Sequence, residues 1–520
     1  MNKIPSLAWL VVSSLVAAQA VHAQSALELS IDGGSYPGPL QISVASGPIG
    51  QFAVVVLSAT TGPVPLSLLD PRDTRVLDVG IESIGQAITG QFFVGNRFTP
   101  PAIPVPNDPG FLDATIHWQA FSLPGQTLFV DKLSFPRVTR FAPANAFRDR
   151  AVNLAIPRAF STALRFPQGS TGEDRWIVVG GGQGGLLAQI ATNTTEIYDP
   201  RTDGYQPGPT LTTERSLHTA TVVGGTKAFL IGGVDRINDP QNTAELLDLA
   251  TMTTAAIAPM RDPRMGHSAT LLGNGKILVA GGLSDLNQPV TPFDPINSAL
   301  TSTELYDPAT NTWTVGPNMN TPRAGHAAIP LPDGRVLLAG GIGWIRVIIK
   351  LPAVFTDCDI YDPATNAITR GPSMGTARTI YPVADLGNGR FLVSGGISSI
   401  QLPNNLGTPT AQAEIYDAST NRWTATGAMQ HARGLHAATP LGGGRFLMVG
   451  GADGAITTPN ALGTTEVFDA AAGSFTAGPP MSLTRAAFAP IVSVTGQLHL
   501  LGGGTGAGAS VVGSTDCYYR

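Results

Sequence analysis

The sequence PRMGHSATLLGNGKILVAGG at residues 263–282, followed by TELYDPATNTWTV at residues 303–315, decides the fold. Its turn signals, a Gly-Asn-Gly at 273–275 and an Asp-Pro-x-x-Asn at 307–311, separate runs that favour β-structure. These runs predict a four-stranded antiparallel meander, whose strands we call a to d in chain order. The second run, at 277–280, is apolar at every position, which is typical of a strand covered on both faces.

The pair of glycines that ends the second run recurs seven times along the chain. The first glycines of the pairs are Gly180, Gly232, Gly281, Gly340, Gly395, Gly450 and Gly502. Self-similarity at about 50 residues indicates stacked or radial repeats, because one such unit cannot bury its apolar faces without neighbours.

Two charged positions recur together with the glycine pair. An arginine precedes strand a in each unit, at Arg158, Arg215, Arg264, Arg323, Arg378, Arg433 and Arg485. An acidic residue stands in strand c, at Glu196, Glu245, Glu304, Asp359, Glu414, Glu466 and Asp516. With the aromatic residues of strands c and d, these positions resemble the kelch repeats of a β-propeller over about residues 145–520. The resemblance implies an all-β fold, which we assign to residues 141–520.

The number of strands predicts how the ring closes. The seventh unit provides strands a, b and c, and the segment 146–152 lies at the right distance before Arg158 to supply the missing strand d. We therefore expect a seven-bladed kelch β-propeller closed by this amino-terminal strand, since closure removes exposed sheet edges. Six blades with one stray unit is the alternative.

The region before the propeller divides into two parts. Residues 1–23 combine Lys3, a short apolar stretch and Val21-His22-Ala23, which is typical of a secretory signal peptide. Residues 24–140 contain strand-like runs between turns rich in proline and glycine, which predict a small β-sandwich-like domain. We expect an exported protein, extracellular or periplasmic, that does not insert into a membrane.

Composition restricts the partners. The net charge is −5 and no basic block occurs, which argues against nucleic acid as a partner. The two cysteines, Cys358 and Cys517, lie three units apart, so we expect two buried thiols; a disulfide or a redox role is the alternative.

The repeated charged residues are expected to form buried ion pairs that hold the blades together. The residues assigned to these pairs are Arg215, Arg264, Arg323, Arg433, Glu245, Glu304, Glu414 and Glu466. The alternative is a ring of arginines that binds an anion at the channel mouth. A histidine follows the arginine by three residues in four units, at His218, His267, His326 and His436. Because this position belongs to the repeat, we expect packing and neither a metal nor a cofactor.

One connection between strands b and c has an unusual composition. The loop from Ile342 to Phe355 is apolar but carries cations and aromatic residues. Aromatic and arginine residues dominate binding hot spots, so the candidate binding residues are Trp344, Ile345, Arg346, Lys350 and Phe355. The alternative is an extended strand pair that packs on its neighbours.

The resemblance implies a binding role more than a catalytic one. Kelch proteins mostly bind other molecules, and the sequence contains no nucleophile elbow, zinc-protease or phosphate-binding motif. We predict a monomeric, non-catalytic protein that presents its b–c loops to a protein or glycan ligand. The alternative is a carbohydrate-active enzyme of the galactose oxidase-like or sialic acid mutarotase type. No Tyr-His dipeptide of the oxidase pattern occurs here.

Overall fold

The computed structural model describes residues 26–519, except for short gaps. The gaps are 33–34, 46–50, 60, 67–74, 80–86, 93–96, 113, 124–129, 131, 135–136, 169–172, 184–189, 200–203, 287–293, 348, 402–404, 456–457, 493–496 and 507–509. The predicted signal peptide lies outside the described residues. The described residues form β-strands and short 3₁₀ helices. Within this part of the chain, no helix is long and apolar enough to cross a membrane.

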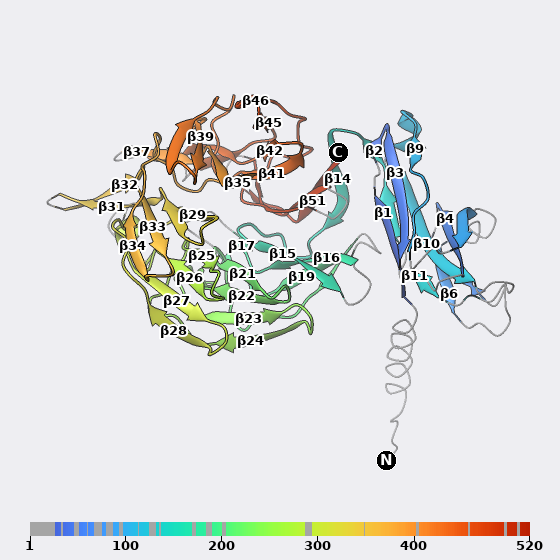
Figure 1. Ribbon diagram of the computed structural model, residues 1–520, viewed down its shortest axis with the longest axis horizontal. Coiled ribbons are helices and arrows are strands. Elements are labelled where there is room, and N and C mark those ends of the chain that lie inside the picture. Colours follow the sequence, from blue (N-terminus) through green and yellow to red (C-terminus); the bar gives the residue numbers. More distant parts are fainter. Residues whose placement is uncertain are drawn as a thin grey trace, which may run out of the picture.

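The repeats form four-stranded antiparallel sheets arranged as the blades of a propeller (Figure 1). Blades 1 to 3 are β15 (Thr162–Gln168), β16 (Glu173–Val179), β19 (Thr195–Asp199) and β20 (Gly204–Pro207); β21 (Thr219–Val223), β22 (Lys227–Ile231), β23 (Ala244–Asp248) and β24 (Thr253–Ile257); and β25 (Ser268–Leu271), β26 (Ile277–Ala280), β27 (Thr303–Asp307) and β28 (Thr312–Val315). Blades 4 to 6 are β29 (Ala327–Pro330), β30 (Val336–Ala339), β33 (Cys358–Asp362) and β34 (Ala367–Arg370); β35 (Val383–Gly387), β36 (Arg390–Ser394), β39 (Ala413–Asp417) and β40 (Arg422–Ala425); and β41 (Ala437–Gly442), β42 (Arg445–Val449), β45 (Thr465–Asp469) and β46 (Ser474–Ala477).

One further four-stranded sheet, blade 7, combines strands from the two ends of the propeller sequence. It contains β47 (Ala489–Val492), β48 (Leu498–Leu501), β51 (Ser514–Tyr519) and, outermost, β14 (Ala146–Asn153). β14 pairs antiparallel with β51, and this is the segment for which the sequence predicts a closing strand. The hydroxyl of Tyr518 donates a hydrogen bond to Oδ1 of Asn145 at 2.6 Å. The same bond joins Tyr306 to Asn311 within blade 3, so Asn145 replaces the asparagine of a normal c–d turn.

The residues two positions after the repeated arginines meet around the propeller axis. All of them have a positive φ, between 53° and 62°: Phe160, Leu217, Gly266, Gly325, Ile380, Leu435 and Ala487. Six backbone N–H···O bonds connect these residues in series, from Ile380 through Gly325, Gly266, Leu217, Phe160 and Ala487 to Leu435. We call these seven residues the axial ring. A left-handed conformation is costly for bulky residues, and here it lets six of the backbone amides reach the neighbouring blade.

The strands before the propeller form their own core. The sheet runs in the order β7 (Ala87–Phe92), β4 (Phe52–Ser58), β10 (Thr115–Leu123), β11 (Leu133–Ser134), β1 (Ala26–Asp32), β3 (Gly38–Ala45) and β8 (Arg97–Phe98), with β12 (Arg137–Arg140) on β10 and β9 (Ile103–Val105) on β3. Two smaller pairs are β2 (Ser35–Tyr36) with β13 (Ala142–Pro143) and β5 (Thr61–Pro65) with β6 (Val76–Val79), and η3 (Pro109–Phe111) precedes β10. Trp118, Val55 and Ile42 are central to the buried cluster. This unit lies beside the propeller (Figure 1).

Both cysteines are buried in the propeller and neither forms a disulfide. Cys358 lies on β33 and Cys517 on β51. Burial raises the pKa of the Cys358 thiol to about 12, so the thiol stays protonated at neutral pH.

Candidate binding site

The repeated arginines are internal braces of the blades. Arg264 is fully buried, and its guanidinium donates to the carbonyl oxygen of Gly281 at 2.7 Å and to that of Ser302 at 3.2 Å. It also donates to Oε1 of Glu304 at 2.6 Å, while the backbone N–H of Arg261 donates to the other oxygen of that carboxylate. The arginine thus connects the entry to strand a, the glycine pair after strand b, and strand c.

Ion pairs within a blade recur around the propeller. The N–O distances are 2.7 Å for Arg158–Glu196, 2.7 Å for Arg215–Glu245, 3.1 Å for Arg323–Asp359, 2.7 Å for Arg378–Glu414 and 2.9 Å for Arg433–Glu466. All of these arginines have a relative exposure of 0%, so they form no exposed anion site at the channel mouth.

The two blades with aspartate in place of glutamate differ from the others. Aspartate is one methylene shorter, and in blade 4 a second acid, Asp357, contacts Arg323 at 2.9 Å and supplements Asp359. Blade 7 has Ser514 at the corresponding position, and its hydroxyl accepts a bond from Arg485 at 3.0 Å. Asp516 bonds to Ser482 instead, and burial raises its pKa.

The repeated histidines are spacers between blades. Nε2 of His218 and of His267 is hydrogen-bonded to the hydroxyl of Thr162 and Thr219, respectively, on the preceding blade, both at 3.0 Å. His326 and Ser268 repeat the contact at 2.9 Å. Burial lowers the pKa of His218 and His326 to about 3, so these rings are neutral at physiological pH.

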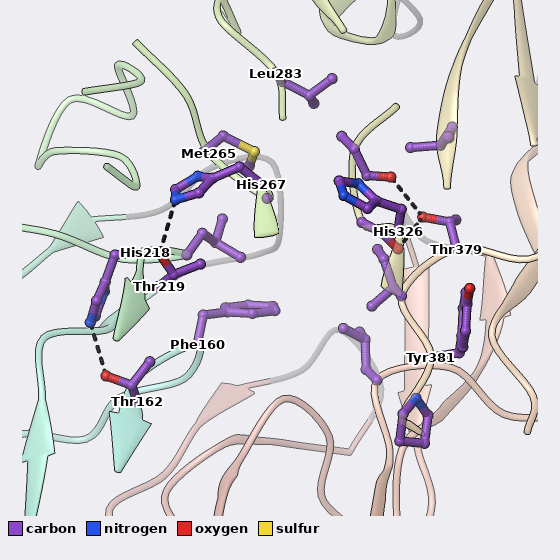
Figure 2. A pocket seen from close by; sticks show the side chains of 18 of the residues that line it. Phe160, Thr162, His218, Thr219, Met265, His267, Leu283, His326, Thr379 and Tyr381 are labelled. Carbon is purple, nitrogen blue, oxygen red and sulfur yellow. Dashed lines mark hydrogen bonds between the residues drawn. The ribbon is translucent and has the colours of Figure 1, made fainter. Parts of the chain in front are cut away.

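A cavity of about 450 Å³ opens at the axial ring on the face that carries the b–c loops (Figure 2). We call it the axial cavity. Its apolar lining includes Phe160, Leu217, Met265, Leu283, Ile296, Ile342, Ile380 and Leu435. The polar lining comes from the histidine spacers and from Ser161, Thr162, Thr219, Thr379 and Tyr381. Sequence reasoning did not identify this cavity.

The unusual b–c loop of blade 4 is a β-hairpin that projects from the propeller (Figure 1). It consists of β31 (Ile342–Arg346) paired with β32 (Lys350–Val354). Apolar side chains are exposed near its turn: Ile345 by 46%, Val347 by 68% and Ile349 by 66%. We call these three residues the hairpin tip. Arg346 beside them is also exposed.

Two side chains fix the hairpin to the neighbouring blade: Trp344 in the middle of β31 and Lys350 beside the turn. The Trp344 indole N–H donates to the carbonyl oxygen of Ala299 at 3.2 Å. The Lys350 ammonium donates to the carbonyl oxygen of Asn297, in η5 (Asp294–Ser298), at 2.8 Å and lies 4.2 Å from the centre of the Trp344 ring. Such a cation–π contact stabilises by about 0.5–1 kcal/mol at an exposed site. The hairpin is therefore braced against the neighbouring blade and has an exposed apolar tip.

Phe355 is a correction to the predicted set of binding residues. It follows β32 and is only 7% exposed, with its ring centre 6.0 Å from the guanidinium carbon of Arg323. The sequence pattern could not distinguish an aromatic residue at the loop end that turns inward from one that faces solvent. The predicted surface residues are therefore Trp344, Ile345, Arg346 and Lys350.

Further hairpins extend the rim on the same side of the ring. β37 (Ile397–Gln401) pairs with β38 (Asn405–Pro409), β43 (Ala452–Ala455) with β44 (Thr458–Ala461), β49 (Gly504–Thr505) with β50 (Ser510–Val511), and β17 (Gly182–Gln183) with β18 (Ile190–Ala191). β32 contacts β37, β38 contacts β43, and β44 contacts β49. The rim is thus continuous from blade 4 to blade 7.

Comparisons with known proteins agree with a kelch-type repeat. Residues 264–320 match the model of the Kelch motif. Alpha-scruin of Limulus polyphemus is 29% identical over 141 residues, which cover 26% of this chain and 15% of alpha-scruin. The match thus spans a small part of that relative.

Two solved structures have a similar fold. A fungal alcohol oxidase of the AA5 family, in complex with copper, is similar with a TM-score of 0.51 and 18% identity, over 70% of this chain and 77% of the oxidase. YjhT is similar with a TM-score of 0.43 and 14% identity, over 58% of this chain and 93% of YjhT. With the Kelch motif and the repeated sheets, the chain is a kelch-type β-propeller, which confirms the predicted all-β class.

Among the residues that the structure describes, no group of three or more His, Cys, Asp or Glu side chains could hold a metal ion. Nε2 of each spacer histidine is hydrogen-bonded to a hydroxyl: His218, His267, His326 and His436. At 18% identity, the likeness to the oxidase concerns the fold alone.

Proposed function

We propose that this chain is an exported, non-catalytic binding protein that presents the b–c face of its propeller to a partner. The observation that carries the proposal is the braced hairpin β31–β32 with its apolar tip. Three large aliphatic side chains stand exposed on one projecting element, and such exposed groups mark interaction sites. The brace at Trp344 and Lys350 reduces the entropy lost when the tip binds.

The chemistry of the hairpin favours a protein partner over a glycan. Its residues from Ile342 to Phe355 include Arg346 and Lys350 but no acid, although the whole chain has a net charge of −5. An apolar tip beside an exposed arginine fits a protein surface that offers an apolar pocket next to acidic groups. Sugar-binding sites need polar groups that pair with hydroxyls, and the tip residues have none in their side chains.

The alternative function, a carbohydrate-active enzyme, has less support in the residues. A general base needs a pKa near the working pH, and the pKa values of His218 and His326 are about 3. A nucleophilic thiolate needs a lowered pKa, and burial raises that of Cys358. These side chains instead serve packing.

The test compares the full chain with a triple variant, Ile345→Ser, Val347→Ser and Ile349→Ser. Both are cross-linked to exported proteins of the source cells and applied to a glycan array. We expect one saturable protein partner that binds the wild type and loses binding to the triple variant. The matched control is Ile237→Ser, because Ile237 is 78% exposed in blade 2 and lies outside the hairpin.

Two outcomes would overturn the proposal. One is a partner that binds the triple variant as tightly as the wild type. The other is stoichiometric copper uptake with turnover in an alcohol oxidation assay, which would establish the enzyme alternative.

A further inference from the structure

We propose that the axial cavity is a binding site for a small, uncharged, lipophilic molecule. The site is distinct from the hairpin tip that the proposed function uses. Three features of the described residues lead to this assignment: a vacant position in the axial ring, the neutral lining and the size of the cavity.

The vacant position arises because two adjacent blades have glycine where four blades have large side chains, while blade 7 has the small Ala487. Phe160, Leu217, Ile380 and Leu435 occupy the equivalent positions and line the cavity. Gly266 and Gly325 line it without a side chain. A Cβ atom added at Gly266 would meet nothing closer than the backbone nitrogen of Gly325, at 3.9 Å. The space that a side chain at position 266 would occupy is therefore empty of protein atoms near its Cβ position.

The two glycines differ in what the fold requires of them. A Cβ atom on Gly325 would lie 2.5 Å from Oγ1 of Thr379, so the packing of blade 5 excludes a side chain there. Gly266 meets no such contact, and its φ of 62° is close to the 55° that Leu217 adopts in blade 2. Because the ring accepts leucine in this conformation, packing does not account for the glycine at 266. Its effect is to enlarge the cavity.

The lining selects for an uncharged ligand. Among the described residues that line the cavity, none is Asp, Glu, Lys or Arg. The spacer histidines are neutral, since burial lowers the pKa of His218, His267, His326 and His436.

Four of the five hydroxyl groups in the lining are bonded to the protein, while Oγ of Ser161 is buried without a partner among the described residues. Thr162 and Thr219 bond to histidines, Thr379 donates to the carbonyl oxygen of Gly325, and Tyr381 donates to that of Ala339. A charged or sugar-like ligand would lose its water without gaining equivalent bonds. An aliphatic or aromatic ligand has no such cost.

The volume suits a small molecule. The cavity measures about 450 Å³, within the range of about 300–1,000 Å³ that ligand pockets occupy. Lining that is mainly apolar, with a few polar groups, is the usual composition of such pockets. An apolar cavity of about 150 Å³ already binds benzene. The axial cavity therefore has room for a molecule larger than one aromatic ring.

The experiment titrates the full chain with Nile red, an uncharged lipophilic dye, and follows its fluorescence. Competition uses octan-1-ol and octanoate at neutral pH, which share a chain length but differ in charge. We expect saturable dye binding that octan-1-ol displaces and octanoate does not. The variant Gly266→Leu should weaken dye binding by about tenfold or more. Its melting temperature should be somewhat lower than that of the wild type, because leucine at a φ of 62° is strained, so binding is measured at a temperature where the variant is folded.

A second variant covers the case in which Gly266→Leu does not fold. Leu435→Phe places in blade 6 the residue that Phe160 provides in blade 1, with φ values of 55° and 53°. This variant should also narrow the cavity and weaken the binding of the dye. The Ile345, Val347 and Ile349 triple variant is the control for dye bound at the hairpin tip, and it should bind normally.

Several results would overturn the inference: absence of saturable dye binding, equal binding by a folded cavity variant, or equal displacement by octanoate. Loss of binding in the triple variant alone would show that the dye reports on the hairpin. Gly266→Leu could weaken the binding of a protein partner while no small probe binds to the wild type. The cavity would then accept a side chain of the partner, and the inference would be wrong. Each result is independent of whether the tip binds a partner.

Discussion

The carboxylate of Glu304 on β27 accepts a hydrogen bond from the Arg264 guanidinium at 2.6 Å and one from the Arg261 backbone N–H at 2.8 Å. Only 2% of the Glu304 surface is exposed. The substitution Glu304→Gln keeps the shape but turns one acceptor oxygen into a donor and leaves Arg264 without its main counter-charge. Breaking a buried pair in this way costs about 3–5 kcal/mol. We expect a clearly lower melting temperature in a thermal unfolding experiment. An unchanged melting temperature would contradict the role of the pair.

Asp516→Asn is the matched control, because Asp516 bonds to Ser482 and burial raises its pKa. A pKa that is higher in the folded than in the unfolded chain means that folding favours the protonated acid. This contribution to stability is present in acid and is lost as the pH rises through the folded pKa. Wild-type stability should therefore fall relative to that of Asp516→Asn as the pH rises above about 4, the ordinary pKa of an aspartic acid. A difference in melting temperature that does not change with pH would contradict this prediction.

At the scale of the element, the hairpin depends on its brace at Trp344 and Lys350. Trp344 donates to the carbonyl oxygen of Ala299 and lies under the Lys350 ammonium, so Trp344→Ala removes both contacts. We expect trypsin to cleave after Arg346 and Lys350 several-fold faster, because the hairpin opens locally, with little change in the melting temperature. The fragments identify the site by mass. The control is Ile345→Ser, which changes only the tip and should be cleaved by trypsin at the wild-type rate. Equal cleavage rates for the wild type and both variants would show that Trp344 does not brace the hairpin.

The sequence predicts most elements of a blade well and their connections less well. The apolar run at 277–280 and the turn signals around it coincide with β26 and with the start of β27 at Thr303. These features are local. An extended strand pair is one of the two alternatives that the sequence of residues 342–355 allows, and the structure has the pair β31–β32 there. The inward position of Phe355 could not be predicted, because a loop sequence does not fix which side chains turn inward.

The axial cavity could not be predicted because it depends on residues about 50 positions apart. The left-handed conformation of Leu217 and Leu435 leaves no trace in propensity, since leucine rarely adopts it. Gly266 looks like any turn glycine until the ring places it beside Gly325. The sequence did contain a signal that Asp516 bonds to a partner other than the repeated arginine of its blade. The side chain of aspartate is one methylene shorter than that of glutamate, and Ser514 stands where blade 4 has a second acid, Asp357.

At the scale of the whole molecule, stability depends on the pairing of β14 with β51, because this sheet joins segments that are more than 350 residues apart. Phe147 on β14 is 5% exposed, and its ring centre lies 5.1 Å from that of Tyr518. It also belongs to a buried cluster with residues of blade 6, such as Leu447. Closure is therefore part of the packing of two blades.

Phe147→Ala should destabilise the propeller by about 3–5 kcal/mol, because the cavity that it leaves lies where the ring closes. Hydrogen exchange should show the largest loss of protection in β51, whose outer edge then loses its partner strand. The control is Phe111→Ala, which removes a ring that packs on Phe141, 5.3 Å away, against the core of the leading strands. If Phe147→Ala left the protection of β51 unchanged, or lowered it no more than Phe111→Ala does, β14 would not hold the ring closed, because a strand that closes a propeller cannot lose its main buried side chain without weakening its partner.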